Sequence, residues 1–159
     1  MKDLGMMHYF LGMEVWQNAN GISMGQGMYV VEILKRFRMM FCKSMTTPMA
    51  SNLKLLSDAA SEGVDAIMYH QMIGSLMYLM NTRPDICFAM NTLSQFLMNP
   101  IHVHLIATKH ILRYLKGTVD YGIGISWIRR LTWNVMLIHI GKVVPSIGRE
   151  LLDVASVWD

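Results

Sequence analysis

The chain has 159 residues, of which 53% are hydrophobic and 16% are charged, and its formal net charge is +3. This length suits one domain with ample core material, and the small positive charge permits a polyanionic partner without requiring one. The sequence predicts no signal peptide, because no charged N-terminal region is followed by a long apolar run, and no membrane span, because no apolar run reaches about 18 residues.

The N-terminal segment is predicted to form a β-hairpin. Residues 6–15, "MMHYFLGMEV", have the apolar and aromatic character of a strand, and Gly12 within them indicates a bulge or a close backbone approach. The "NANG" sequence at 18–21 is typical of a tight turn, and "GISMG" then reads as the returning strand.

Two helices are predicted to follow. The first starts near Met28, and one of its faces is apolar: Val30, Ile33, Leu34, Phe37. Lys35 and Arg36 lie near its end, where cations suit the helix dipole. Residues 46–61 read as a loop, and helical spacing resumes near Asp65. The apolar stripe of this second helix is Ile73, Leu76, Met77, Met80.

The "TRPD" sequence at 82–85 is interpreted as a break between helices. Thr82 is a suitable N-cap, and Pro84 and Asp85 suit the first turn of a new helix. This interpretation is preferred to a catalytic acid at Asp85. The new helix is expected to end at Asn99–Pro100. Another is expected over residues 101–116, with Gly117 as its stop, before a strand over residues 121–127.

Few residues carry recognisable chemistry. Two cysteines, Cys42 and Cys87, are too few for a disulfide framework and favour small buried apolar roles in an intracellular protein, if it is expressed. His102 and His104 are two residues apart on a helix, so their side chains should diverge and no metal site is predicted. Three cations share one face of the last helix: Lys109, Arg113, Lys116. This stripe either follows phosphates or is a solvated face.

Five long segments, in order and spacing, resemble the Ty1/copia-type retrotransposon reverse transcriptase of plant-type Pol polyproteins. They are "DLGMMHYFLGMEV", "YVVEILKRF", "CKSMTTPM", "MIGSLMYLMNTRPDICFAMNTLSQF" and "HLIATKHILRYLKGTVDYGI", and the resemblance covers about residues 3–125.

The resemblance implies an α+β fold in three parts. Residues 1–25 would be the end of the polymerase palm, with a primer-grip-like hairpin at Leu11 and Gly12. Residues 26–118 would be a mostly helical region like the thumb and connection, and residues 119–130 a strand that leads toward an RNase H domain.

The resemblance also implies that catalytic acids are missing. In the family, a Tyr-Val-Asp-Asp turn holds Mg²⁺ for nucleotide addition and precedes the first of the five segments. No aspartate of the matched region lies in such a turn: Asp3, Asp58, Asp65, Asp85, Asp120. No catalytic residue, metal ligand or cofactor is therefore assigned.

The resemblance assigns the cations and the hairpin to a weak contact with an RNA or DNA template–primer. The assigned residues are Leu11, Gly12, Lys35, Arg36, Lys109, Arg113, Lys116. Three departures lower the expected affinity for phosphates: Met28 stands where the family usually has Lys, and His70 and His110 stand where Arg is usual.

Residues 131–159 do not match the family and are interpreted as an out-of-frame tail. A one-base shift with suitable codons turns "VMLIHIGK" and "SIGRELLDVASVW" into motifs like those of the family's RNase H domain. Such a tail is expected to be poorly ordered or nonspecifically collapsed, and dispensable for the fold, because Trp133, Val135, Leu137 and Ile138 show no periodicity matched to a partner.

The sequence thus predicts a truncated remnant of a copia-type reverse transcriptase, with at most weak, nonspecific nucleic-acid binding and without catalysis. Two alternatives stay open. The chain is a non-catalytic piece that completes a split polymerase, or it is a small helical interaction module that self-associates through exposed apolar surface. No membrane partner is expected.

Overall fold

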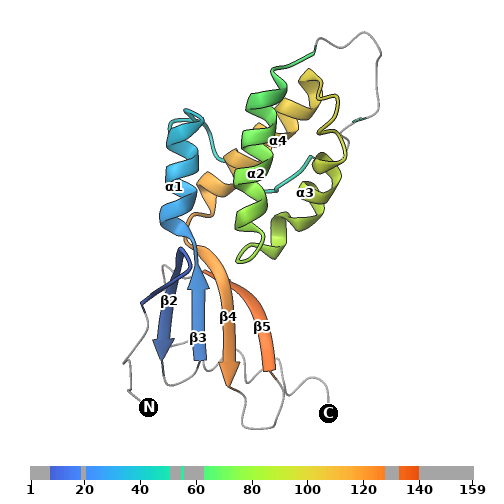
Figure 1. The fold of residues 1–159 in the computed structure, drawn as a ribbon. Coiled ribbons are helices and arrows are strands. Elements are labelled where there is room, and N and C mark those ends of the chain that lie inside the picture. The colour runs from blue at the N-terminus through green and yellow to red at the C-terminus, as the bar shows by residue number, and fades with distance from the viewer. Residues whose placement is uncertain (1–7, 19–20, 51–54, 56–62, 128–132, 140–159) are drawn as a thin grey trace.

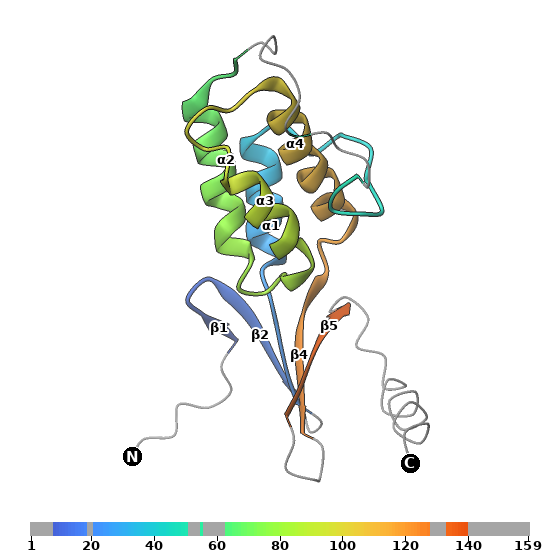
Figure 2. The ribbon, with the colours of Figure 1, turned by 90° about the vertical axis from the view of Figure 1, so that its right-hand side faces the viewer.

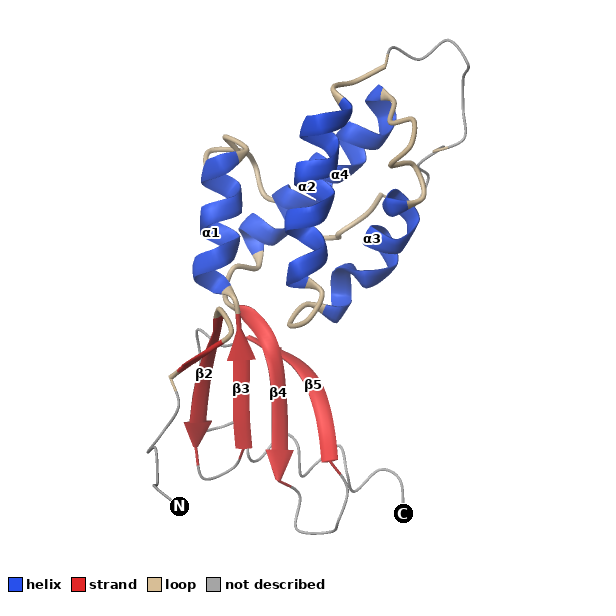
Figure 3. Ribbon diagram, in the orientation of Figure 1, coloured by secondary structure: helices blue, strands red, loops and turns tan. Residues whose placement is uncertain are grey.

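The computed structural model describes residues 8–18, 21–50, 55, 63–127 and 133–139. They form a five-stranded antiparallel sheet and a group of four α-helices, which lies beyond one end of the strands (Figures 1 and 3). The predicted α+β class is therefore confirmed. Within the described residues, no helix is long and apolar enough to cross a lipid bilayer.

The sheet combines three strands that precede the helices in the sequence with two strands that follow them. The strands are β1 (Tyr9–Phe10), β2 (Met13–Asn18), β3 (Gly21–Gly25), β4 (Tyr121–Trp127) and β5 (Trp133–His139), hydrogen-bonded in that order. The predicted hairpin is confirmed, since β2 pairs with β3 from Asn18↔Gly21 to Glu14↔Gly25. β4, predicted over the same residues, lies antiparallel to β3.

The single strand predicted over residues 6–15 is wrong in its middle, because the chain reverses at Leu11 and Gly12. Both residues have left-handed backbone angles, with φ of 48° and 76°, and two such residues in succession make a tight hairpin turn. β1 therefore pairs back onto β2. The close approach expected at Gly12 is confirmed, since a Cβ there would lie 2.7 Å from the Tyr78 hydroxyl oxygen.

The helical part contains α1 (Gly27–Arg36), α2 (Ala66–Leu79), α3 (Cys87–Ser94) and α4 (His102–Gly117), with a short 3₁₀ helix, η1 (Pro84–Ile86), before α3. The apolar face predicted for α1 is confirmed by burial of Val30, Ile33 and Leu34. α2 begins where the Asp65 carboxylate accepts hydrogen bonds from two backbone N–H groups of the first turn.

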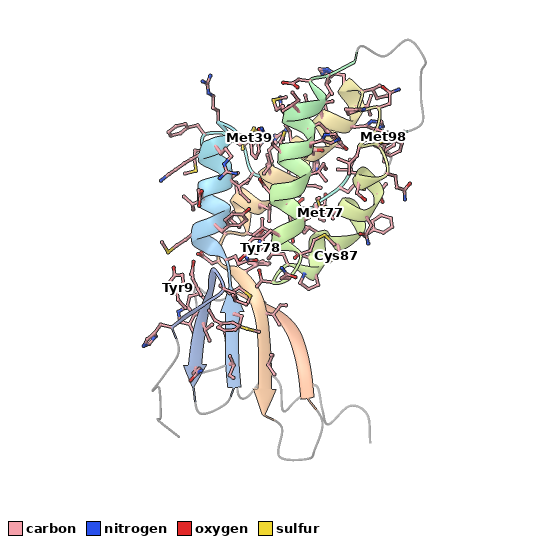
Figure 4. All side chains as sticks on the ribbon, in the orientation of Figure 1. Tyr9, Met39, Met77, Tyr78, Cys87 and Met98 are labelled. Carbon is pink, nitrogen blue, oxygen red and sulfur yellow. The ribbon has the colours of Figure 1, made fainter. Side chains whose placement is uncertain are left out.

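The stripe predicted for α2 is only partly correct. Ile73 and Leu76 are buried, whereas Met77 is 50% exposed. Tyr69, Met72 and Leu79 complete the buried face, and Met77 lies next to it around the helix, pointing away from the core (Figure 4).

The helix break at "TRPD" is confirmed, but the expected N-cap is wrong. Thr82 is buried, and its hydroxyl donates a 2.6 Å hydrogen bond to the side-chain oxygen of Gln26, next to α1. Arg83 takes the cap position of η1, and Pro84 and Asp85 lie in its first turn as predicted.

The helix that follows is shorter than expected, and α4 agrees with its prediction within one residue. α3 ends at Ser94 rather than at residues 99–100. The Leu93 carbonyl accepts hydrogen bonds from the backbone N–H of Phe96 and from the Tyr69 hydroxyl of α2, so the chain turns out of the helix there.

The expectation that the tail has no ordered partner is wrong for β5. The backbone of β5 pairs with β4 over seven positions, from Tyr121↔His139 to Trp127↔Trp133. Pairing at a sheet edge satisfies backbone N–H and C=O groups whatever the side chains are. Residues 140–159 lie outside the described residues, and the out-of-frame origin of the tail stays a prediction.

The hydrophobic core lies among the four helices. Its fully buried members include Ile33, Leu76, Leu93, Ile111 and Leu115. Several methionines pack against this core from its edges: Met39, Met40, Met45, Met49, Met68, Met80. Methionine side chains are flexible, so they can fill the irregular edges of a core.

Candidate nucleic-acid interface

A buried ion pair joins the helix break to the end of α4. The Arg83 side chain is 1% exposed, and it donates to both carboxylate oxygens of Asp85, at 3.0 and 2.8 Å. It also donates to the carbonyl oxygen and the hydroxyl of Thr118, at 2.8 and 2.6 Å. The Tyr114 hydroxyl of α4 donates to Asp85 at 2.7 Å.

These contacts fix the charge of Asp85. Burial favours a higher pKa, but the hydrogen bonds from Arg83 and Tyr114 and the Arg83 charge hold the pKa of Asp85 below its ordinary value. Burial, followed by the Asp85 contact, raises the pKa of Tyr114 to about 12. Asp85 is therefore an ionised structural group at neutral pH, which agrees with its interpretation as part of a helix restart.

Other described acids also have structural partners. Glu14 accepts the Met28 backbone N–H at 2.8 Å, Asp65 caps α2, and Glu32 pairs with Arg36 at 3.1 Å. Glu14 and Asp120 line a 230 Å³ pocket between the sheet and the helices. Across the described part of the chain, no group of three or more His, Cys, Asp or Glu side chains could hold a metal ion.

The hairpin turn at Leu11 and Gly12 is fixed by α2. The Tyr78 hydroxyl donates a 2.5 Å hydrogen bond to the Leu11 carbonyl oxygen, and Tyr78 lies at the end of α2 nearest the sheet (Figure 4). Leu11 is 73% exposed, beside the exposed rings of Tyr9 and Phe10. The turn is therefore a rigid apolar tip.

The structure does not bring this tip together with the cations of α1. Lys35 and Arg36 lie in the last turn of α1, the end farthest from the sheet (Figure 1). Both are exposed, and Arg36 pairs with Glu32 one turn earlier.

The three cations of α4 lie together beside a loop. We call the loop residues 41–47 and the adjoining face of α4 the α4–loop surface (Figure 2). Four hydrogen bonds hold it together: Lys116 Nζ to the Cys42 carbonyl, Arg113 Nε to the Lys43 carbonyl at 2.8 Å, Met45 N–H to the Arg113 carbonyl at 3.2 Å, and His110 Nε2 to the Thr47 carbonyl at 3.0 Å. Lys109 is exposed.

The α4–loop surface is cationic. Neither residues 37–50 nor α4 contains an Asp or Glu. The ion pairs recorded among described residues are Arg83–Asp85 and Arg36–Glu32, so no described carboxylate neutralises Lys43, Lys109, Arg113 or Lys116. Sequence reasoning found the α4 cations but missed Lys43, because the loop gave no sign of lying against α4.

Sequence reasoning also missed Phe41, whose side chain is 100% exposed at the start of this loop. A large apolar residue in a segment with cations and without acids was the available signal.

His70 and His110 each hold a loop in place. His70 Nε2 lies 2.9 Å from the Leu97 carbonyl oxygen, and His110 holds Thr47 in the same way. His102 is exposed, whereas His104 is buried and accepts the Ile101 backbone N–H, so the predicted divergence of these two side chains is confirmed. Cys42 and Cys87 are free and partly buried.

The chain is similar to known transposon proteins. The family model for reverse transcriptase (RNA-dependent DNA polymerase) matches residues 1–51. The retrovirus-related Pol polyprotein from transposon RE1 of Arabidopsis thaliana is 44% identical over 123 residues, which is 77% of this chain and 8% of that protein. The corresponding polyprotein from transposon TNT 1-94 of Nicotiana tabacum is 39% identical, over 74% of this chain and 10% of that protein. An uncharacterised mitochondrial protein of Arabidopsis thaliana is 38% identical, over 77% of this chain and 51% of that protein. No solved structure matches the chain.

The fold and this surface define an α+β protein in which a loop and a helix, neither containing an acidic residue, together present a cationic surface. The chain belongs to the reverse transcriptase family of Ty1/copia-type transposon Pol polyproteins. It spans a small part of the polyproteins that it matches, and about half of the mitochondrial relative.

Proposed function

We propose that this chain is a non-catalytic segment of a copia-type reverse transcriptase that binds a nucleic-acid template–primer weakly and without sequence preference. The observation that carries the proposal is the α4–loop surface, which holds four cations and no acid in either segment: Lys43, Lys109, Arg113, Lys116.

The dimensions of α4 suit the backbone of one strand. Lys109 and Lys116 are seven residues apart, about 10 Å along a helix. One strand of a duplex carries a phosphate about every 3.4 Å of axis, so this stripe can face about three phosphates. Binding of this kind releases counterions and depends on salt rather than on sequence.

The acids support a role without catalysis. Two-metal nucleotide transfer needs carboxylates free to hold Mg²⁺. Asp65, Asp85 and Glu14 each accept hydrogen bonds that maintain the fold. In the whole enzyme, Mg²⁺ would instead be held by the family's Tyr-Val-Asp-Asp turn, which precedes the segment that residues 3–125 resemble.

A protein contact through the hairpin is the second candidate function. The exposed tip formed by Tyr9, Phe10 and Leu11 favours an apolar partner or another copy of the chain. Such association would rise with protein concentration and be insensitive to salt, whereas nucleic-acid binding would fall with salt.

The salt dependence of binding tests the proposed function. The slope of log affinity against log salt should fall by about 0.7–0.9 for each cation removed from the interface. We therefore expect a slope lower by about 1.4–1.8 in Lys43→Gln/Lys109→Gln, whose two side chains are exposed and hold no loop contact. An unchanged slope in the double variant would show that the α4–loop surface is only solvated.

A further inference from the structure

Phe41 is an unusual residue for its surroundings. Phenylalanine is among the most buried residue types, yet this side chain is 100% exposed. The backbone around it is fixed, since Lys116 and Arg113 of α4 hold the carbonyls of the two residues that follow it. The ring therefore projects into solvent from a loop that is hydrogen-bonded to α4.

The described exposed residues that flank Phe41 in the sequence do not form an apolar docking patch. The other exposed residues between 38 and 47 are charged or hydroxyl-bearing: Arg38, Lys43, Ser44, Thr46, Thr47. A protein partner that buried this ring would also have to desolvate the adjacent cations, which is costly without acids to pair them. An isolated aromatic ring among cations is instead the composition of a surface for single-stranded nucleic acid.

We infer that Phe41 stacks on an unpaired base, so that the α4–loop surface prefers single-stranded nucleic acid to duplex. This inference rests on the proposed nucleic-acid binding. The bases of a duplex stack on one another and offer no free face, whereas an unpaired base offers its π-face to an aromatic ring. The phosphates that flank the stacked base would then lie over the cations of the loop and of α4.

Binding of matched oligonucleotides by the full chain tests this inference. The probes are an unstructured single strand and a duplex of the same sequence, each titrated at several salt concentrations. Phe41→Ala should weaken single-strand binding about 5- to 100-fold, as loss of one base–aromatic stack does, and should leave the salt slope unchanged. Duplex binding should not change, and Phe41→Trp should keep or tighten single-strand binding.

The matched control is Phe88→Ala, because Phe88 is also exposed, at 76%, but lies on α3. It should leave both affinities unchanged. Equal thermal unfolding of Phe41→Ala and the parent chain shows that the fold is intact, as expected for a fully exposed side chain. The inference is overturned if Phe41→Ala leaves single-strand affinity unchanged or weakens duplex binding equally. If the parent chain binds neither probe at low salt, the proposed function itself fails.

Discussion

Replacing Asp85 with Asn should lower the free energy of unfolding by about 3 kcal/mol at neutral pH, because the buried Arg83 guanidinium loses its counter-charge. The Arg83 and Asp85 side chains are 1% and 13% exposed. Asn keeps one acceptor for Arg83 or Tyr114, so the loss falls at the low end of the range for a broken buried pair. Urea unfolding of both proteins measures the difference.

The pH dependence of this difference identifies its cause. The pKa of Asp85 is lowered from an ordinary value of 3.8, so its ionised form stabilises the fold fully above about pH 4. That stabilisation disappears as the pH falls through the lowered pKa. The gap between parent and Asp85→Asn should therefore be constant above pH 4 and narrow below it. Asp65→Asn is the control, and it should change stability by less than about 0.5 kcal/mol, since Asn caps helices as well as Asp does. A gap that stays the same in acid would contradict an ion-pair origin.

Gly12→Ala should lower the free energy of unfolding by about 2–3 kcal/mol, through backbone strain and a lost hydrogen bond. Gly12 has a φ of +76°, and an added Cβ would meet the Tyr78 hydroxyl oxygen at 2.7 Å. That hydroxyl is held by the Leu11 carbonyl, so it cannot retreat without losing its bond. Chemical unfolding measures the loss.

Two further variants separate the causes. Gly74→Ala has nothing within 4 Å of the added Cβ, and it lies within α2, so it should stabilise the protein by about 0.5–1 kcal/mol. In a Tyr78→Phe background the hydroxyl is gone, so Gly12→Ala should cost only the backbone strain, about 1–2 kcal/mol. Equal costs in both backgrounds would mean that Tyr78 does not constrain the turn.

The elements predicted well are those with local causes. The face of α1 follows from apolar spacing, and α4 and β4 follow from a helix stop at Gly117 and the turn after it. The β2–β3 hairpin follows from its turn residues. Each of these signals lies within a few residues of the structure that it predicts.

The errors have distant causes. Thr82 bonds to Gln26, 56 residues earlier, and therefore does not cap a helix. α3 ends where Tyr69 of α2 reaches the Leu93 carbonyl. β5 forms because the edge of β4 is open for backbone pairing, and no sequence pattern within residues 131–159 predicts that pairing.

The candidate site also combines features that follow from local sequence with features that depend on distant parts of the chain. The shared face of Lys109, Arg113 and Lys116 follows from helical spacing. Their contact with the loop does not, since Arg113 and Lys116 meet carbonyls 70 and 74 residues earlier in the chain. The surroundings of Phe41 could be found only once the loop was placed against α4.

We expect the chain to bind a template–primer without extending it. The most direct test gives the purified chain a labelled primer annealed to an RNA template, with Mg²⁺ and all four deoxynucleotides. Fluorescence anisotropy and a sequencing gel then follow the same sample. Anisotropy should rise at low salt and fall as salt is added, while the primer keeps its length. Primer extension above a control without protein would show that the chain is catalytic, and an anisotropy that does not rise at low salt would show that it does not bind the template–primer.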